Sequence, residues 1–260
     1  MGWRGYIDET RETVFFWSQK AACTTLFSFL ADNIEPRPPA KKFFHIHSEP
    51  WYICREALAR GFQSAILVRH PVSRAISAYM NKFCVYQGRP LRTRRDLEPF
   101  ARDLHDLWCR RSGHDRPLAD NLITFEEFLA TIADMIAHRP EPQSPEQQQC
   151  PINGHWEGQM PPFLAEEGYV HDHVIHVERL DTELGHLARR LGMIYHPQVL
   201  NRTETKADSA PDYLGRRPAR AVAGMTFGPA NFITPGTLAR LHRIYALDFE
   251  SFGYPVKPEG

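Results

Sequence analysis

The feature that most constrains the fold is an apolar run that stops at a polar loop and resumes as a helical stripe. Residues 14–17 (VFFW) form the run, and residues 18–20 (SQK) interrupt it. The apolar side chains that follow, at positions 22, 26, 29 and 30, recur with the spacing of one helix face. This segment is therefore predicted to form a strand, a tight loop and a helix over 24–33.

The loop carries groups that suit a bound phosphate. The first N–H groups of a helix lack internal partners and lie at the positive end of the helix dipole, so they attract anions. Lys20 adds a positive charge, and the hydroxyls of Thr24 and Thr25 add hydrogen-bond donors. The spacing is not the Gly-x-x-x-x-Gly-Lys of nucleotide triphosphatases, and ordinary helix capping is the alternative interpretation.

A second segment repeats the pattern. Residues 65–68 (AILV) are typical of a buried parallel strand, and residues 72–83 have helical spacing behind a proline that suits a first helical turn. Arg69 lies at the carboxyl end of the strand, and Ser77 lies off the apolar face of the helix. Ligands of open α/β sheets bind at such strand ends, and a guanidinium matches phosphate oxygens. A surface ion pair for Arg69 is the weaker interpretation beside two phosphate-suited loops.

Five segments resemble the sulfotransferases that use 3′-phosphoadenosine-5′-phosphosulfate (PAPS). Residues 19–25 (QKAACTT) are similar to the Pro-Lys-x-x-Cys-Thr pattern of the carbohydrate, chondroitin-type enzymes, and residues 68–79 (VRHPVSRAISAY) resemble the arginine and serine motif of their 3′-phosphate site. The other segments that resemble this group are 155–159 (HWEGQ), 177–181 (VERLD) and 245–254 (YALDFESFGY). Position 19 is Gln where the family usually has Pro, and residues 88–151 match none of its patterns.

The resemblance implies an α/β fold of three layers, P-loop-like, with a central parallel sheet flanked by helices, in one domain over 1–260. It implies a sulfotransferase of the EC 2.8.2 type, which moves a sulfuryl group from PAPS to a hydroxyl of a carbohydrate or similar acceptor. The product of the donor is 3′-phosphoadenosine-5′-phosphate, and no metal is required.

The resemblance also implies roles for individual residues. Lys20 would stabilise the leaving phosphate and the transferring group. Arg69 and Ser77 would hold the 3′-phosphate. The 5′-phosphosulfate would be held by Lys20, Ala21, Ala22, Cys23, Thr24 and Thr25.

A general base must take the proton of the acceptor, and residues 43–49 (FFHIHSE) offer candidates. This segment is predicted to contain a second short strand over 43–47, on which His45 and His47 share one side. A histidine pKa of about 6.5 suits base catalysis. We favour His47 because it lies nearer the carboxyl end of the strand, and a structural histidine is the alternative.

Contacts with the acceptor are expected from Glu49, His155 and Trp156, and His155 is a rival base. The polar, proline-rich stretch at 139–155 is predicted to be a mobile loop. The acceptor's identity and the role of residues 88–151 stay open.

The remaining segments alternate helices and strands, which implies a parallel sheet joined by right-handed crossovers. The further elements predicted from apolar spacing are helices near 51–60, 97–109, 125–138, 182–191 and 235–249, and a strand at 174–177.

Composition narrows the function classes and the setting. The chain of 260 residues has 31 basic and 31 acidic residues, so bulk attraction to nucleic acid or to an anionic membrane is not expected. No apolar stretch approaches the roughly 20 residues of a membrane span. The five cysteines are irregularly spaced, as expected of reduced thiols. We therefore expect a soluble, cytoplasmic, bacterial enzyme of undetermined oligomeric state.

Two other functions are weighed against sulfuryl transfer. A P-loop-type phosphotransferase (kinase) would share the strand–loop–helix logic, but its glycine-rich motif is missing. A non-catalytic nucleotide-binding protein of the same fold would not need Lys20 or a supply of candidate bases.

Overall fold

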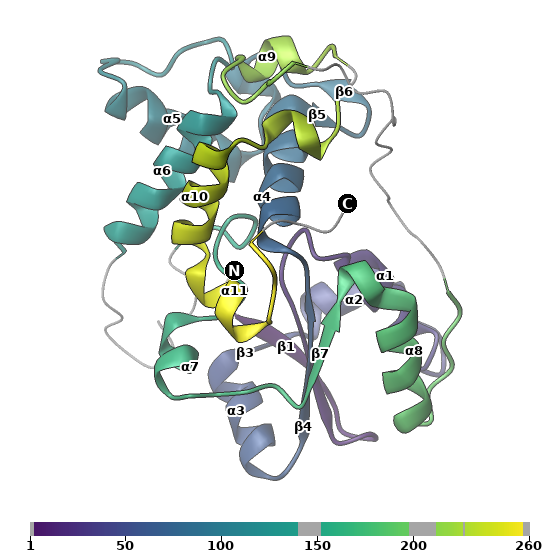
Figure 1. Cartoon of the computed structure of the whole chain (residues 1–260). Coiled ribbons are helices and arrows are strands. Elements are labelled where there is room, and N and C mark those ends of the chain that lie inside the picture. Colours follow the sequence, from purple (N-terminus) through teal and green to yellow (C-terminus); the bar gives the residue numbers. More distant parts are fainter. Residues whose placement is uncertain (1–2, 140–151, 198–211, 226, 257–260) are drawn as a thin grey trace. The chain divides into compact units, whose positions relative to one another are not determined.

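The computed structural model describes residues 3–139, 152–197, 212–225 and 227–256, which belong to two compact units (Figure 1). The first unit consists of Met1–His70, Pro140–Thr203 and Leu247–Tyr254, and the second unit of Pro71–Arg139, Glu204–Ala246 and Pro255–Gly260. The chain therefore crosses between the units repeatedly. The prediction of a single domain stays a prediction, and residues 140–151 of the predicted loop lie outside the described residues.

A five-stranded sheet forms the centre of the first unit (Figure 1). Its strands are β1 (Arg4–Asp8), β2 (Thr13–Trp17), β3 (Glu49–Pro50), β4 (Gln63–Val68) and β7 (His173–His176). They lie in the order β3-β1-β2-β4-β7. The strands β2, β4 and β7 are parallel, as predicted, but β1 pairs antiparallel with both β2 and β3. The prediction of a wholly parallel sheet is therefore wrong at one edge.

The missed edge begins with a hairpin. A carboxylate oxygen of Asp8 accepts hydrogen bonds from the backbone N–H groups of Thr10 and Arg11, both at 3.1 Å, and so fixes the turn between β1 and β2. Glu12 completes the turn with a left-handed φ of 47°. The sequence gives little sign of β1 because a five-residue strand with two large apolar side chains, Tyr6 and Ile7, makes no recognisable alternation.

Helices cover both faces of this sheet. The helical segments of the first unit are α1 (Cys23–Ala31), α2 (Ala40–Ile46), α3 (Trp51–Ala59), α7 (Pro162–Glu166), the 3₁₀ helix η4 (Val177–Arg179), α8 (Leu180–Arg190) and α11 (Ala246–Ser251), whose first residue belongs to the second unit. The predicted helices at 24–33, 51–60 and 182–191 are thus confirmed, and so are the strands at 14–17, 65–68 and 174–177.

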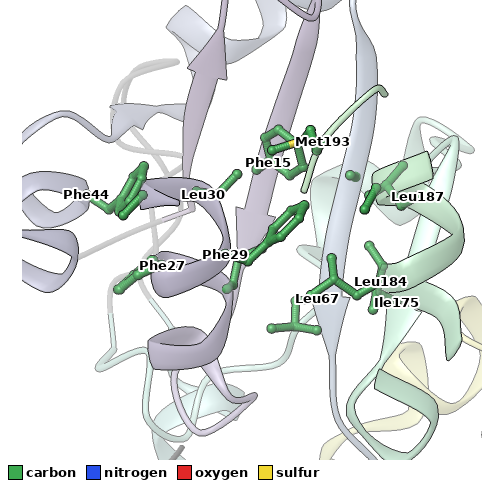
Figure 2. Close-up of a cluster of buried hydrophobic side chains, with 14 residues drawn as sticks. Phe15, Phe27, Phe29, Leu30, Phe44, Leu67, Ile175, Leu184, Leu187 and Met193 are labelled. Carbon is green, nitrogen blue, oxygen red and sulfur yellow. The ribbon is translucent and has the colours of Figure 1, made fainter. Parts of the chain in front are cut away.

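Two apolar clusters hold the three layers together. Figure 2 shows the first, in which strand residues such as Phe15 and Leu67 pack against α1, α2 and α8. The second lies on the opposite face, where Phe16 and Ile66 pack with Trp51 of α3 and Leu164 of α7. Successive side chains of a strand point to opposite faces, so neighbouring residues of β2 serve different clusters.

The predicted strand at 43–47 is wrong, because these residues lie in and directly after α2. Ala40, Phe43 and Phe44 recur at helical spacing and contact the first apolar cluster. Phe44 is fully buried, with its ring centroid 4.9 Å from that of Tyr6 and 5.4 Å from that of Phe27. Burial of this helix face decides the local structure, and His45 and His47 therefore do not share a strand face.

The second unit is mainly helical. Its elements are α4 (Pro71–Tyr79), the π-helix η1 (Met80–Cys84), β5 (Val85–Tyr86), β6 (Arg89–Pro90), η2 (Arg94–Asp96), α5 (Pro99–Arg111), α6 (Phe125–Ala137), α9 (Ala219–Val222), η5 (Pro229–Phe232) and α10 (Pro235–Ile244). Aromatic rings of Tyr79, Phe83, Phe125, Phe128 and Phe232 pack together at its core.

The helices predicted in the second unit are confirmed with one correction. The segments predicted at 72–83, 97–109 and 125–138 are helical. The single helix predicted over 235–249 is instead two helices, α10 and α11, which are separated at Tyr245.

Candidate active site

The loop between β2 and α1 has an unusual backbone. Lys20 has a φ of 68° and Ala22 a φ of 51°, whereas Ala21 between them lies outside the left-handed region. Backbone that alternates in this way forms an anion-binding nest, in which successive N–H groups point to one side. The sequence places the loop at the carboxyl end of a parallel strand, and the structure gives it the form that suits a phosphate.

The amides of this loop divide into two sets. The N–H of Ala21 donates to the carbonyl of Ser18 at 3.3 Å, and that of Thr25 donates to the carbonyl of Ala22 at 2.9 Å. Within the described residues, the N–H groups of Ala22, Cys23 and Thr24 make no such backbone bond. These three amides are therefore the candidates for an anion at the start of α1, and those of Cys23 and Thr24 also face the Cys23 thiol.

Cys23 lies at this helix start and contacts the first apolar cluster. Burial raises the pKa of its thiol, with a smaller opposing effect from Lys20. The group is thus held as a neutral thiol, which suits packing rather than nucleophilic attack.

Gln159 joins the ends of β2 and β4. Its side-chain oxygen accepts from the hydroxyl of Ser18 at 3.0 Å and from the backbone N–H of Arg69 at 2.8 Å. Its side-chain amide donates to the backbone carbonyl of Arg69 at 2.8 Å. Gln159 is fully buried, so one side chain fixes the position of the loop relative to Arg69.

Asp248 lies behind Gln159. Its carboxylate accepts from the backbone N–H groups of Gln159 at 2.6 Å and Met160 at 2.8 Å, and from the Gln159 side chain at 3.3 Å. The middle and terminal segments that resemble family motifs thus form one buried network with the loop between β2 and α1.

Glu178 fixes the backbone of His70, the residue that follows Arg69. Its carboxylate accepts from the backbone N–H of His70 at 2.9 Å and from the hydroxyl of Tyr254 at 3.1 Å. Burial raises the pKa of Tyr254, and the charge of Glu178 raises it further, so this hydroxyl stays a donor. The backbone directly after β4 is therefore held by two side chains, Gln159 and Glu178.

Arg69 lies next to the loop of Lys20. Its guanidinium donates to the backbone carbonyl of Lys20 at 3.2 Å, so Arg69 and the loop of Lys20 are neighbours at the carboxyl ends of β2 and β4. Ser77 is half-buried on α4 in the second unit. The expectation that Arg69 and Ser77 hold one phosphate stays a prediction.

The second arginine of the motif has a structural position. Arg74 is buried to 1% exposure, and its guanidinium lies 6.0 Å from the ring centroid of Tyr245. Tyr79 of the same motif is fully buried and donates to the carbonyl of Ile123 at 3.1 Å. These motif residues build the core of the second unit.

A pocket with about 480 Å³ of empty space, part of it open to solvent, lies beside the loop between β2 and α1, and we call it the outer pocket. Its lining residues in the described chain are Trp3, Arg4, Trp17, Ser18, Gln19, His45, Ser48, Gly154, Glu157 and Gly158. Burial and the charge of Lys41 lower the pKa of His45, so its imidazole is neutral near pH 7. The pocket therefore brings a candidate base to the loop that carries Lys20.

The other predicted acceptor contacts are not among the residues that line this pocket in the described chain. His47 stacks on Phe43, with ring centroids 4.3 Å apart. Glu49 is half-buried in β3, Trp156 is fully buried, and the ring of His155 is 2.6 Å from the side-chain oxygen of Asn153. Sequence reasoning gave no role to Trp17 or Glu157, although Trp17 directly precedes the loop, and it missed Trp3 and Arg4, since nothing in their local pattern places them there.

The described residues also bear on metals, thiols and membranes. Within them, no group of three or more His, Cys, Asp or Glu side chains is placed to hold a metal ion. The four cysteines of the described residues are free thiols. In this part of the chain, every helix is too short or too polar to cross a bilayer.

The sequence model of the sulfotransferase family matches residues 6–255. The chain belongs to the sulfotransferase family. It is 23% identical over 268 aligned residues to carbohydrate sulfotransferase 11 of Rattus norvegicus, an alignment that covers 96% of this chain and 66% of the rat protein. The chain thus spans about two thirds of the length of that relative, and no solved structure gave a significant match.

These findings confirm the resemblance to the carbohydrate-type sulfotransferases and support a transferase of the EC 2.8.2 type. The segments that resemble family motifs at 19–25, 155–159, 177–181 and from Leu247 on lie within the first unit. There Gln159 bonds to Ser18, which precedes the first segment, and to Asp248, and Glu178 bonds to Tyr254.

Proposed function

We propose that this sulfotransferase uses PAPS as its donor and transfers the sulfuryl group to a hydroxyl of a carbohydrate or similar acceptor. The observation that carries the proposal is the buried Gln159 network. Gln159 bonds both to Ser18, in the loop after β2, and to Arg69, directly after the neighbouring parallel strand β4. This supports a P-loop-like donor site without the glycine-rich motif of the nucleotide triphosphatases.

On the donor side, the amides of Ala22, Cys23 and Thr24 and the threonine hydroxyls hold the 5′-phosphosulfate. The ammonium of Lys20 stabilises the charge that develops on the leaving phosphate, where positioning and electrostatics dominate. The 3′-phosphate is assigned to Arg69 and Ser77 on the motif resemblance.

On the acceptor side, the hydroxyl oxygen attacks sulfur as the bond between sulfur and the bridging phosphate oxygen breaks. A base takes the hydroxyl proton. We assign this role to His45 ahead of His47, because His45 lines the outer pocket and is a neutral imidazole near pH 7.

A kinase-type reaction is not favoured, since family membership supports sulfuryl transfer. The proposal predicts that adenosine 3′,5′-bisphosphate raises the melting temperature far more than ATP, ADP or AMP. A ligand that binds the native state at 100 times its Kd stabilises it by about 2.7 kcal/mol. A thermal-shift panel at equal ligand concentrations checks this, and a larger shift with ATP would contradict the assignment of the donor.

A further inference from the structure

A second pocket, the inner pocket, shares walls with the outer pocket. It has about 300 Å³ of empty space, part of which is open to solvent, and is lined by Trp3, Arg4 and Trp17, which also line the outer pocket. Its other walls are mainly apolar and include Phe16, Ile66 and Leu164. The two pockets therefore differ in character but adjoin the same side chains.

Two polar atoms in the wall of the inner pocket lack partners. The indole N–H of Trp51 and the Nδ1 of His171 are buried and make no hydrogen bond in the described residues. Trp51 is 3% exposed and His171 is 7% exposed. A buried polar group without a partner costs about 1–3 kcal/mol, so two in one small pocket need an explanation.

These two groups complement a hydroxyl. The Trp51 N–H is a donor only, so it needs an acceptor atom. Burial lowers the pKa of His171 to about 4, so the ring is neutral near pH 7 and its Nδ1 can accept a hydrogen bond from a hydroxyl. The rings of Phe16 and Tyr169 lie 5.4 Å and 5.0 Å from His171, centroid to centroid, which leaves apolar surface around this polar end.

We propose that the inner pocket binds a ring-sized apolar part of the acceptor that carries one hydroxyl, while the reacting hydroxyl lies in the outer pocket. This rests on the proposed function, because it assigns the outer pocket to the acceptor. A bare sugar ring does not fit the inner pocket, since its several hydroxyls would meet two polar partners and apolar walls. The acceptor is therefore a glycoconjugate or phenolic compound rather than a plain saccharide.

The direct test uses 4-fluorophenol as the probe, with fluorobenzene as the analogue that lacks the hydroxyl. Fluorine NMR titration of the full chain measures both affinities. A hydroxyl that bonds to Trp51 and His171 should make 4-fluorophenol bind about tenfold more tightly than fluorobenzene. Equal affinities, or no binding of either probe, would overturn the proposal.

Two tryptophan variants locate the site. Trp51→Phe keeps an aromatic ring but removes the N–H, and it should weaken 4-fluorophenol several-fold without changing fluorobenzene. Trp108→Phe is the matched control, because Trp108 is also buried with an unpartnered N–H but belongs to the second unit and lines neither pocket. Equal effects of the two substitutions on 4-fluorophenol would place the probe elsewhere and overturn the assignment.

A measurement of adenosine 3′,5′-bisphosphate binding on the same samples separates the two claims. If the bisphosphate fails to bind while 4-fluorophenol binds with the expected pattern, the donor assignment is wrong and the inner pocket stands. The reverse result leaves the donor site and removes the ring-binding pocket.

Discussion

Lys20 has a left-handed backbone at the point where the donor loop turns towards α1. A non-glycine residue in this region costs of order 1 kcal/mol, so the loop is held in place by its surroundings. Gln159 and Arg69 supply that support, because they bond to Ser18 and to the carbonyl of Lys20. The charge at this position is thus presented from a rigid loop.

Replacement of Lys20 by Ala should lower turnover by roughly 10²–10³-fold, the scale of losing one preorganised stabiliser of transition-state charge. The substitution keeps a side chain at the strained position, so the fold should survive. Steady-state kinetics with PAPS measures the effect. Lys42→Ala, at an exposed position of α2, is the control and should leave turnover unchanged. Equal turnover in the two variants would remove Lys20 from the mechanism.

His171 should make stability depend on pH. Burial lowers its pKa to about 4, whereas the unfolded value is about 6.5. Between these values the unfolded state binds the proton and the folded state does not. The free energy of unfolding therefore falls as pH drops from about 6.5 to 4, by on the order of 3 kcal/mol, and is unaffected by this group above that window.

Urea unfolding at pH 7.5 and pH 5 measures this loss. His171→Phe should reduce the difference between the two pH values, whereas substitution of the exposed His138 by Phe should not. An unchanged pH dependence in His171→Phe would show that the buried imidazole does not titrate as described.

At the scale of elements, strand ends are held by side chains from distant segments. Gln159 and Glu178 bond to the backbone of Arg69 and His70, and Asp248 bonds to Gln159. The positions of β2 and β4 in the sheet bring the loops together, and this network fixes their relative geometry. Loss of one member should therefore affect both loops.

Gln159→Leu should lower the free energy of unfolding by about 2–5 kcal/mol, because it leaves the Ser18 hydroxyl and both backbone groups of Arg69 buried without their partner. It should also weaken binding of adenosine 3′,5′-bisphosphate. Chemical denaturation and calorimetric titration measure the two effects. Gln63→Leu is the control, since Gln63 is half-buried and bonds through its side chain to His173. Similar losses in both variants would contradict a special role for Gln159.

The sequence allowed the parallel strands and most helices to be predicted because each has an apolar run or stripe of its own. The segment at 43–47 was wrongly predicted to be a strand because its alternation of apolar residues and histidines fits one. In the structure the segment is helical, and Phe44 packs against Tyr6 and Phe27. The motif segments led to the predicted roles of Lys20 and Arg69, and the structure places Arg69 next to the loop of Lys20. The Gln159 network and the place of Trp3 in the pocket could not be predicted from the sequence, since the residues they contact are distant in sequence.

At the scale of the whole molecule, the chain crosses between two units, and the motif segment at 68–79 is divided between them. Arg69 belongs to the first unit, whereas Ser77 belongs to the second. The composition of the sequence does not change where the chain passes from one unit to the other, so the sequence predicts a single domain. The two units are defined by contacts between residues that are distant in sequence.

The balanced charge of the molecule should make solubility lowest near pH 7, where the formal net charge is zero. The 13 histidines gain protons towards pH 6, so solubility should rise more steeply on the acid side until unfolding intervenes. Precipitation by polyethylene glycol at pH 6, 7 and 8.5 measures this. A solubility that changes in one direction across the range would show that uneven surface charge dominates over net charge.

The placement of Asp248 has a consequence for biosynthesis. The donor loop and Arg69 are made first, and the carboxylate that anchors their shared glutamine is made about 180 residues after Arg69. A nascent chain therefore carries the loop of Lys20, Arg69 and Gln159 before Asp248 is present to anchor Gln159. Premature termination between Gln159 and Asp248 would yield a chain that has the loop of Lys20, Arg69 and Gln159 but lacks the carboxylate that holds Gln159.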